Sequence, residues 1–162
     1  GGSTGSVVIN NALRSILPDL LKEFQVIHLC GKGRLDHSLD HLEGYVQYEY
    51  ISKELKDLMA AADIVLSRAG ANAICELLAL HKPNILVPLS AAVSRGDQIL
   101  NARSFESQGF SYVLEEEQMN AATLLDAIHT VYNKQDTYRK NMESSSLSNG
   151  VDVVLKLIQE LS

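Results

Sequence analysis

The chain alternates short apolar runs with longer stretches of helical period. The runs, which predict β-strands, are residues 25–30, 45–50, 63–67, 84–89 and 110–114. The other stretches carry apolar residues three and four positions apart, which predicts helices over residues 6–24, 55–62, 70–80, 97–108, 121–132, 136–143 and 150–161. Strands that alternate with helices form a parallel sheet covered on both faces. The sequence therefore predicts an α/β fold, a Rossmann-like doubly wound parallel sheet.

Three local features refine this prediction. The run 63–67 (DIVLS) is apolar at consecutive positions, which predicts a strand buried on both faces. Pro18 interrupts the first helical stretch, so we expect either a kink there or the start of a second short helix. Gly109 follows the helix predicted over residues 97–108 and suits its C-terminal cap.

Composition excludes several classes of protein. The 162 residues are enough for one domain over 1–162, and 46% hydrophobic with 21% charged residues is ordinary for a globular chain. A formal charge of −6 leaves no electrostatic footprint for nucleic acid, and no apolar run is long enough to span a bilayer. Cys30 and Cys75 match no metal spacing and are expected to be buried, reduced thiols. We expect no metal and no cofactor.

The chain opens on a glycine-rich turn, residues 1–5, that leads into a helix. Such a turn lets the backbone approach a phosphate, with Ser3 as a hydroxyl donor, although the residues alone favour a turn without a ligand. A loop of this kind normally follows a strand near the centre of the sheet, and here no strand precedes it. We therefore expect a fragment or a trimmed chain that lacks its first strand.

Two predicted strand ends carry polar residues. After residue 67, Gly70 and Ala71 leave room for a ligand at a helix start, and Glu76 either holds two ribose hydroxyls or is a solvated carboxylate. After residue 89, Gln98 and Asn101 are three apart on one helix face, and their amides suit sugar hydroxyls. Asp97 is either the N-cap of that helix or a ligand contact.

These segments, in this order, resemble the C-terminal half of the MurG family, the bacterial transferases that add GlcNAc to lipid I in peptidoglycan synthesis. The resemblance covers essentially the whole chain. The matching pieces are GGSTGS, VIHLCGKG, the strand end at Tyr50 and Ile51, DIVLSRAGANAICELLALHKP, NILVPL and DQILNA. The chain departs from the family pattern at Ser6, Ala73, His81 and Asp97, and His81 stands where the family usually has glycine.

The resemblance implies the C-terminal half of a GT-B glycosyltransferase, a cell-wall enzyme without a cofactor. This half holds UDP-GlcNAc, while a missing N-terminal half supplies the lipid-linked acceptor site and the catalytic residues, so the fragment alone is expected to be inactive. The full-length protein is expected to be cytoplasmic, peripheral on the membrane face. The implied donor contacts are Ser3 at the diphosphate, Ile51 at the uracil, Gly70, Ala71 and Asn72 near phosphate and ribose, Glu76 at the ribose, and Gln98 at the GlcNAc.

Two other functions remain open at this stage. The chain could be a non-catalytic or split-subunit module that binds a UDP-sugar. It could also belong to an enzyme similar to UDP-GlcNAc 2-epimerase, which would need acid and base carboxylates that the sequence does not reveal.

Overall fold

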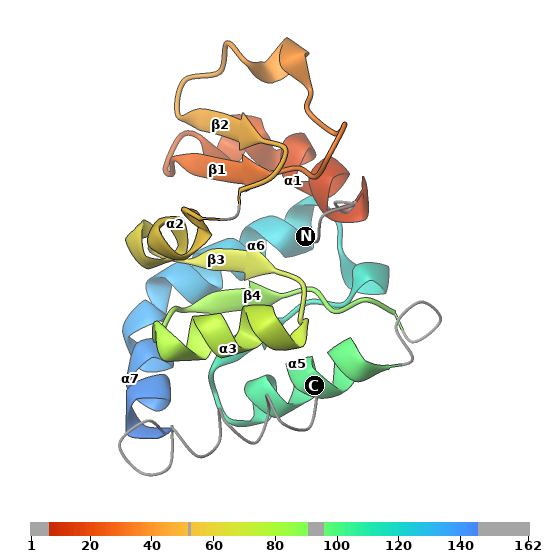
Figure 1. Cartoon of the computed structure of the whole chain (residues 1–162). Coiled ribbons are helices and arrows are strands. Elements are labelled where there is room, and N and C mark those ends of the chain that lie inside the picture. The colour runs from red at the N-terminus through yellow and green to blue at the C-terminus, as the bar shows by residue number, and fades with distance from the viewer. Residues whose placement is uncertain (1–6, 52, 91–95, 146–162) are drawn as a thin grey trace.

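The computed structural model describes residues 7–51, 53–90 and 96–145. Strands and helices alternate as predicted, and the α/β class is confirmed (Figure 1). The predicted helix over residues 150–161 and the glycine-rich turn lie outside the described residues. The elements are α1 (Val7–Leu20), β1 (Val26–Leu29), η1 (His37–Leu39), β2 (Tyr45–Tyr48), α2 (Leu55–Ala61), β3 (Val65–Ser67), α3 (Ala71–Ala79), β4 (Asn84–Leu86), α5 (Asp97–Ser107), β5 (Ser111–Val113), η2 (Glu116–Gln118), α6 (Ala121–Asn133) and α7 (Gln135–Ser145).

The described strands form two separate parallel sheets. β1 pairs with β2, with Val26 opposite Tyr45. β4 lies between β3 and β5, with Ile85 opposite both Leu66 and Tyr112. All strand pairs are parallel, as expected for strands joined by helical crossovers.

Helices cover both faces of the three-stranded sheet. Ile85 and Val87 face a core built with α1 and α6, whereas Leu86 faces a second core built with α3, α5 and α7. Alternate residues of a strand point to opposite faces, so β4 is buried on both. This arrangement confirms the doubly wound prediction.

Three sequence expectations are corrected here. Every residue of β3 is half-buried rather than buried on both faces, because among the described residues β3 has only β4 as a neighbouring strand. Of the two alternatives for Pro18, the second short helix is wrong, since α1 continues through Pro18 to Leu20. Cys75 is half-buried, while Cys30 is fully buried, and both thiols are free.

A buried hydrogen-bond chain joins α1 to β1 and β2. His28 Nε2 lies 2.9 Å from Asn10 Oδ1, and His28 Nδ1 lies 2.7 Å from the Tyr45 hydroxyl. The Asn10 amide donates to the Cys30 carbonyl at 2.8 Å, so its Oδ1 is the acceptor toward His28. His28 therefore carries its proton on Nε2 and accepts from Tyr45 through Nδ1. Burial is the main cause that lowers the pKa of His28 to about 4, with the Arg14 guanidinium second.

Helices α3 and α5 end in the same way. In α5 the Gly109 N–H donates to the Glu106 carbonyl at 3.0 Å and the Phe110 N–H to Phe105 at 2.9 Å. This is a Schellman motif with glycine in the left-handed conformation, φ 77°, as the sequence predicts for Gly109. In α3 the equivalent position is His81, with φ 50°, and it is the one non-glycine residue with positive φ in the described part of the chain.

His81→Gly is expected to raise the free energy of unfolding by about 1 kcal/mol, because a left-handed backbone strains any residue with a Cβ. Urea unfolding monitored by circular dichroism measures the change. The matched control is Gly109→Ala, which should destabilise the chain, since a Cβ there would lie 2.5 Å from Asn141 Nδ2. A lower unfolding midpoint for His81→Gly would contradict the prediction.

Candidate functional site

The candidate site lies where β3 and β4 end side by side. Ser67 of β3 is opposite Leu86 of β4, so the loops that follow both strands leave from the same edge of the sheet. In open α/β sheets this carboxyl edge is where ligands bind. The loop after β3 leads into α3, and the loop after β4 leads toward α5.

Two amides of α5 hold the backbone between β3 and α3. Gln98 Oε1 accepts from the Ala69 N–H at 3.2 Å, and Asn101 Nδ2 donates to the Ala69 carbonyl at 3.0 Å. Gln98 Oε1 also accepts from the Leu89 N–H at 3.0 Å. Ala69 is completely buried, so these side chains satisfy both of its backbone polar groups. We call Gln98, Asn101 and Ala69 the amide clamp.

The amide clamp limits which atoms of Gln98 and Asn101 are available to a ligand. The sequence predicts that Gln98 and Asn101 share a helix face, and their common partner Ala69 confirms it. Gln98 Oε1 is already engaged with protein. The Gln98 Nε2, which would lie 3.8 Å from a Cβ at Gly70, has no protein partner among the described residues and faces the start of α3.

Arg68 is a site residue that the sequence analysis does not assign. Its Nη1 donates to the Val87 and Pro88 carbonyls at 3.2 and 3.5 Å and pairs with Glu116 of η2 at 2.5 Å. Both side chains of this ion pair are largely buried. The guanidinium therefore joins the ends of β3 and β4 to η2. An arginine directly after an apolar strand is the signal that could have found it.

Helix α3 begins without a side-chain cap. Its N-cap is Gly70, which is in an extended conformation. Glycine has no side chain that could accept a hydrogen bond from the first turn. Ala71 and Asn72 are the first two helical residues, so their N–H groups lie at the positive end of the helix dipole. Glu76 is half-buried in the second turn, and its carboxylate has no partner among the described residues.

Outside helix α5 itself, no hydrogen bond or ion pair within the described residues joins the remaining candidates to this group. Ser3 lies outside them, and half-buried Ile51 follows β2 in the other sheet. Asp97 is not the N-cap of α5. The cap is Gly96, with φ 85°, and Asp97 is the first helical residue, where a carboxylate favours the helix dipole.

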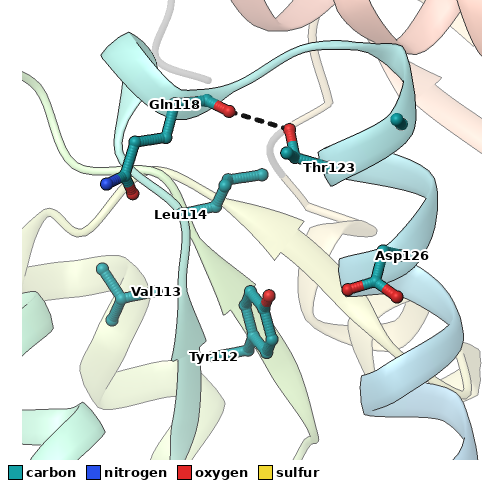
Figure 2. Close-up of a pocket in the computed structure, with 7 residues that line it drawn as sticks. Tyr112, Val113, Leu114, Gln118, Thr123 and Asp126 are labelled. Carbon is teal, nitrogen blue, oxygen red and sulfur yellow. Dashed lines mark hydrogen bonds between the residues drawn. The ribbon is translucent and has the colours of Figure 1, made fainter.

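A separate hollow lies between β5, η2 and α6 (Figure 2). Thr123 Oγ1 donates to the Gln118 carbonyl at 2.8 Å above it, and the Asp126 carboxylate and the Tyr112 ring border it. No candidate from the sequence lines this hollow. Its lining side chains hold one carboxylate and no cation, so it offers little to a diphosphate.

The described residues hold no group of three His, Cys, Asp or Glu side chains arranged to bind a metal ion. None of the helices that the structure describes has the length and apolar character needed to cross a bilayer.

Known relatives match the chain along nearly its full length. The UDP-N-acetylglucosamine--N-acetylmuramyl-(pentapeptide) pyrophosphoryl-undecaprenol N-acetylglucosamine transferase of Lachnoclostridium phytofermentans is 62% identical over 161 residues, which is 99% of this chain and 45% of that protein. The protein of the same name from Geobacillus thermodenitrificans is 58% identical over 159 residues, 98% of this chain and 45% of that protein. The chain thus spans about half the length of the curated relatives it matches.

The fold has a close counterpart among solved structures. The crystal structure of Acinetobacter baumannii MurG superposes with a TM-score of 0.70 at 23% identity, covering 99% of this chain and 48% of that one. This neighbour confirms the predicted Rossmann-like half of a GT-B glycosyltransferase. Residues 1–158 match the family described as glycosyltransferase family 28 C-terminal domain. The chain belongs to that family.

Proposed function

We propose that the chain is the donor-binding domain of a longer, inverting glycosyltransferase that moves GlcNAc from UDP-GlcNAc to a lipid-linked peptidoglycan precursor, lipid I to lipid II. The observation that carries this proposal is the 62% identity to a transferase named for that reaction, over 99% of this chain. The full-length protein would act at the cytoplasmic face of the membrane, where its acceptor is anchored.

The strand ends supply the chemistry that such a donor needs. When the acceptor hydroxyl attacks the anomeric carbon, the bond to UDP breaks and negative charge develops on the diphosphate. The uncapped first turn of α3, at Gly70, Ala71 and Asn72, offers N–H donors and a positive dipole end to that charge. Arg68 does not take this role in our proposal, because Glu116 already neutralises it.

The amides and the carboxylate complete the proposed donor site. Gln98 Nε2 would donate to a GlcNAc hydroxyl while its Oε1 stays in the amide clamp. Glu76, whose carboxylate has no protein partner among the described residues, would accept from two ribose hydroxyls. Ser3 and Ile51 would contact the diphosphate and the uracil, as the resemblance implies.

Glu76→Ala is expected to weaken UDP-GlcNAc binding by about 10- to 150-fold, because hydrogen bonds to a charged acceptor contribute roughly 1.5–3 kcal/mol. Isothermal titration calorimetry on the full-length protein measures the affinity. The affinity of Glu76→Gln should lie between those of the parent and Glu76→Ala, since glutamine keeps the shape of the side chain and loses its charge.

Asp126→Ala is the matched control for this test. It removes a carboxylate from the hollow between β5, η2 and α6 and should leave the affinity for the donor unchanged. Unchanged binding by Glu76→Ala would show that Glu76 is a solvated carboxylate. Loss of binding by Asp126→Ala alone would move the donor site to the hollow beside β5.

A further inference from the structure

Strand β5 is the outermost described strand of the three-stranded sheet, and none of the described strands pairs with its outer edge. On the inner edge the Leu114 N–H donates to the Leu86 carbonyl of β4 at 2.9 Å. Because backbone groups alternate along a strand, the N–H and C=O groups of Ser111 and Val113 point to the outer edge. β5 therefore offers main-chain donors and acceptors to a further strand.

Two hollows lie along this outer edge, and both are lined by Tyr112 and Val113 of β5. The one between β5, η2 and α6, described above, is called the α6 hollow. The other, called the α7 hollow, is also lined by Glu106, Gly109, Ser111 and Tyr138. Tyr112 packs against the core on the α6 side and Val113 against the core on the α7 side, and Figure 2 shows the two side chains leaving β5 on opposite sides. Successive side chains of a strand added here would point to the two hollows in turn.

The α6 hollow suits a basic side chain. The Asp126 carboxylate and the Tyr112 ring border it (Figure 2), and its lining side chains hold no cation. Asp126 is exposed and forms no ion pair within the described residues. Glu117 of η2, which borders the same hollow, is likewise exposed and without an ion pair there. A lysine or arginine that entered the α6 hollow would meet a carboxylate and an aromatic ring, both of which attract a cation.

The α7 hollow suits an uncharged polar side chain. Ser111 is 4% exposed, and its Oγ is buried with no hydrogen-bond partner among the described residues. A buried hydroxyl without a partner costs free energy, which a hydroxyl or amide from a docked segment would recover. The carboxylate of Glu106 in this hollow is already paired with Arg103 at 2.9 Å, so no further cation is needed there.

We propose that the outer edge of β5 docks an extended segment of a partner protein, which adds to the sheet as a strand and alternates basic with small polar side chains. Its backbone pairs with Ser111 and Val113, its basic side chains enter the α6 hollow, and its polar side chains enter the α7 hollow. Main-chain bonds give such a complex its affinity, and the two hollows give it its specificity. A second copy of this chain fits poorly, because it would bring the carboxylates of both edges together. The inference does not rest on the proposed function.

Binding of a labelled ten-residue peptide of alternating lysine and threonine to the full-length protein, measured by fluorescence anisotropy, tests the docking site. We expect saturable binding, and binding at least about tenfold weaker for the same peptide with glutamate in place of lysine. Asp126→Asn should weaken binding of the lysine peptide at least about fivefold, because it removes the free carboxylate of the α6 hollow. Asp57→Asn, at an exposed carboxylate on α2, is the matched control and should change nothing. Equal binding of both peptides, or equal affinities for the two variants, would overturn the proposal.

A pair of variants at Val113 tests the main-chain pairing. Val113→Pro removes an N–H that points to the outer edge and leaves the bonds between β4 and β5 in place, which is where an edge strand tolerates proline. It should weaken peptide binding at least about tenfold more than Val113→Ala does, with circular dichroism confirming that both variants are folded. Equal affinities for the two folded variants would show that the peptide is held by its side chains alone, which contradicts strand addition.

Hydrogen exchange of the unsubstituted full-length protein identifies what covers the edge. The Val113 amide should exchange at least about tenfold more slowly when the lysine peptide is saturating, because a paired amide exchanges only when the structure opens. Slow exchange without peptide at every protein concentration would show that a segment of the protein itself covers the edge. Slow exchange that develops as the protein concentration rises would assign the edge to a second copy. Either result would overturn the proposal.

Discussion

The 162-residue chain alone is expected to bind UDP-GlcNAc and to transfer GlcNAc at least about 10⁴-fold more slowly than the full-length protein. Holding two reactants and a base in one aligned site accounts for effective concentrations of roughly 10⁵–10⁸ M, and that alignment requires a second wall for the acceptor. At the ends of β3 and β4 we propose contacts to the donor and none to the acceptor. The Glu116 carboxylate at the same strand ends does not serve as the base in this expectation, because it is already paired with Arg68.

An assay with UDP-GlcNAc and a soluble lipid I analogue measures this difference. The full-length protein under the same conditions is the positive control, and calorimetry on the isolated chain shows that the donor is bound. Turnover by the isolated chain within tenfold of the full-length protein would mean that the acceptor site lies on this chain.

Acidification is expected to destabilise the chain through His28. In the unfolded chain a histidine takes up its proton near pH 6.5, whereas in the fold the pKa of His28 is lowered to about 4, chiefly by burial. Below pH 6.5 the unfolded state therefore binds more protons, and stability falls until about pH 4. The loss from this residue amounts to about 3 kcal/mol at most. Protonation also breaks the bond that Nδ1 accepts from Tyr45.

Urea midpoints at several values between pH 7.5 and 4 test this expectation. His28→Gln should be less stable than the parent at pH 7.5, because an open-chain amide replaces the ring that bridges Asn10 and Tyr45, and the difference should shrink as the pH falls. His37→Gln is the control, since the side chain of His37 is 77% exposed and its loss should leave the slope unchanged. A constant difference between the parent and His28→Gln would contradict the prediction.

The order of the described α-helices and strands follows from apolar runs and helical spacing, whereas the short 3₁₀ helices η1 and η2 were not predicted. Residues 84–89 and 97–108 differ in period, and the structure has β4 and α5 there, because burial on a strand and on a helix demands different spacings. The half-burial of β3 could not be predicted in this way. An apolar run records which residues are suited to burial, but not whether a neighbouring strand is present to bury them.

The contacts at the ends of β3 and β4 could be predicted only in part. Spacing places Gln98 and Asn101 on one face, and strand ends place Gly70 beside them. Spacing does not reveal that Ala69 lies opposite that face, because the partner is about 30 residues away in the chain. The pairing of Arg68 with Glu116 is hidden for the same reason.

The amide clamp affects how the evolution of this region is interpreted. An acceptor at position 98 serves two backbone N–H groups, and a donor at position 101 serves one buried carbonyl. A descendant that changed its sugar specificity, or no longer bound a sugar, would still need these groups to keep the loop after β3 in place. If relatives keep Gln98 and Asn101, the scaffold alone is enough to explain it. Only substitutions that keep the clamp, such as Gln98→Glu, separate the demand of the fold from the demand of the ligand.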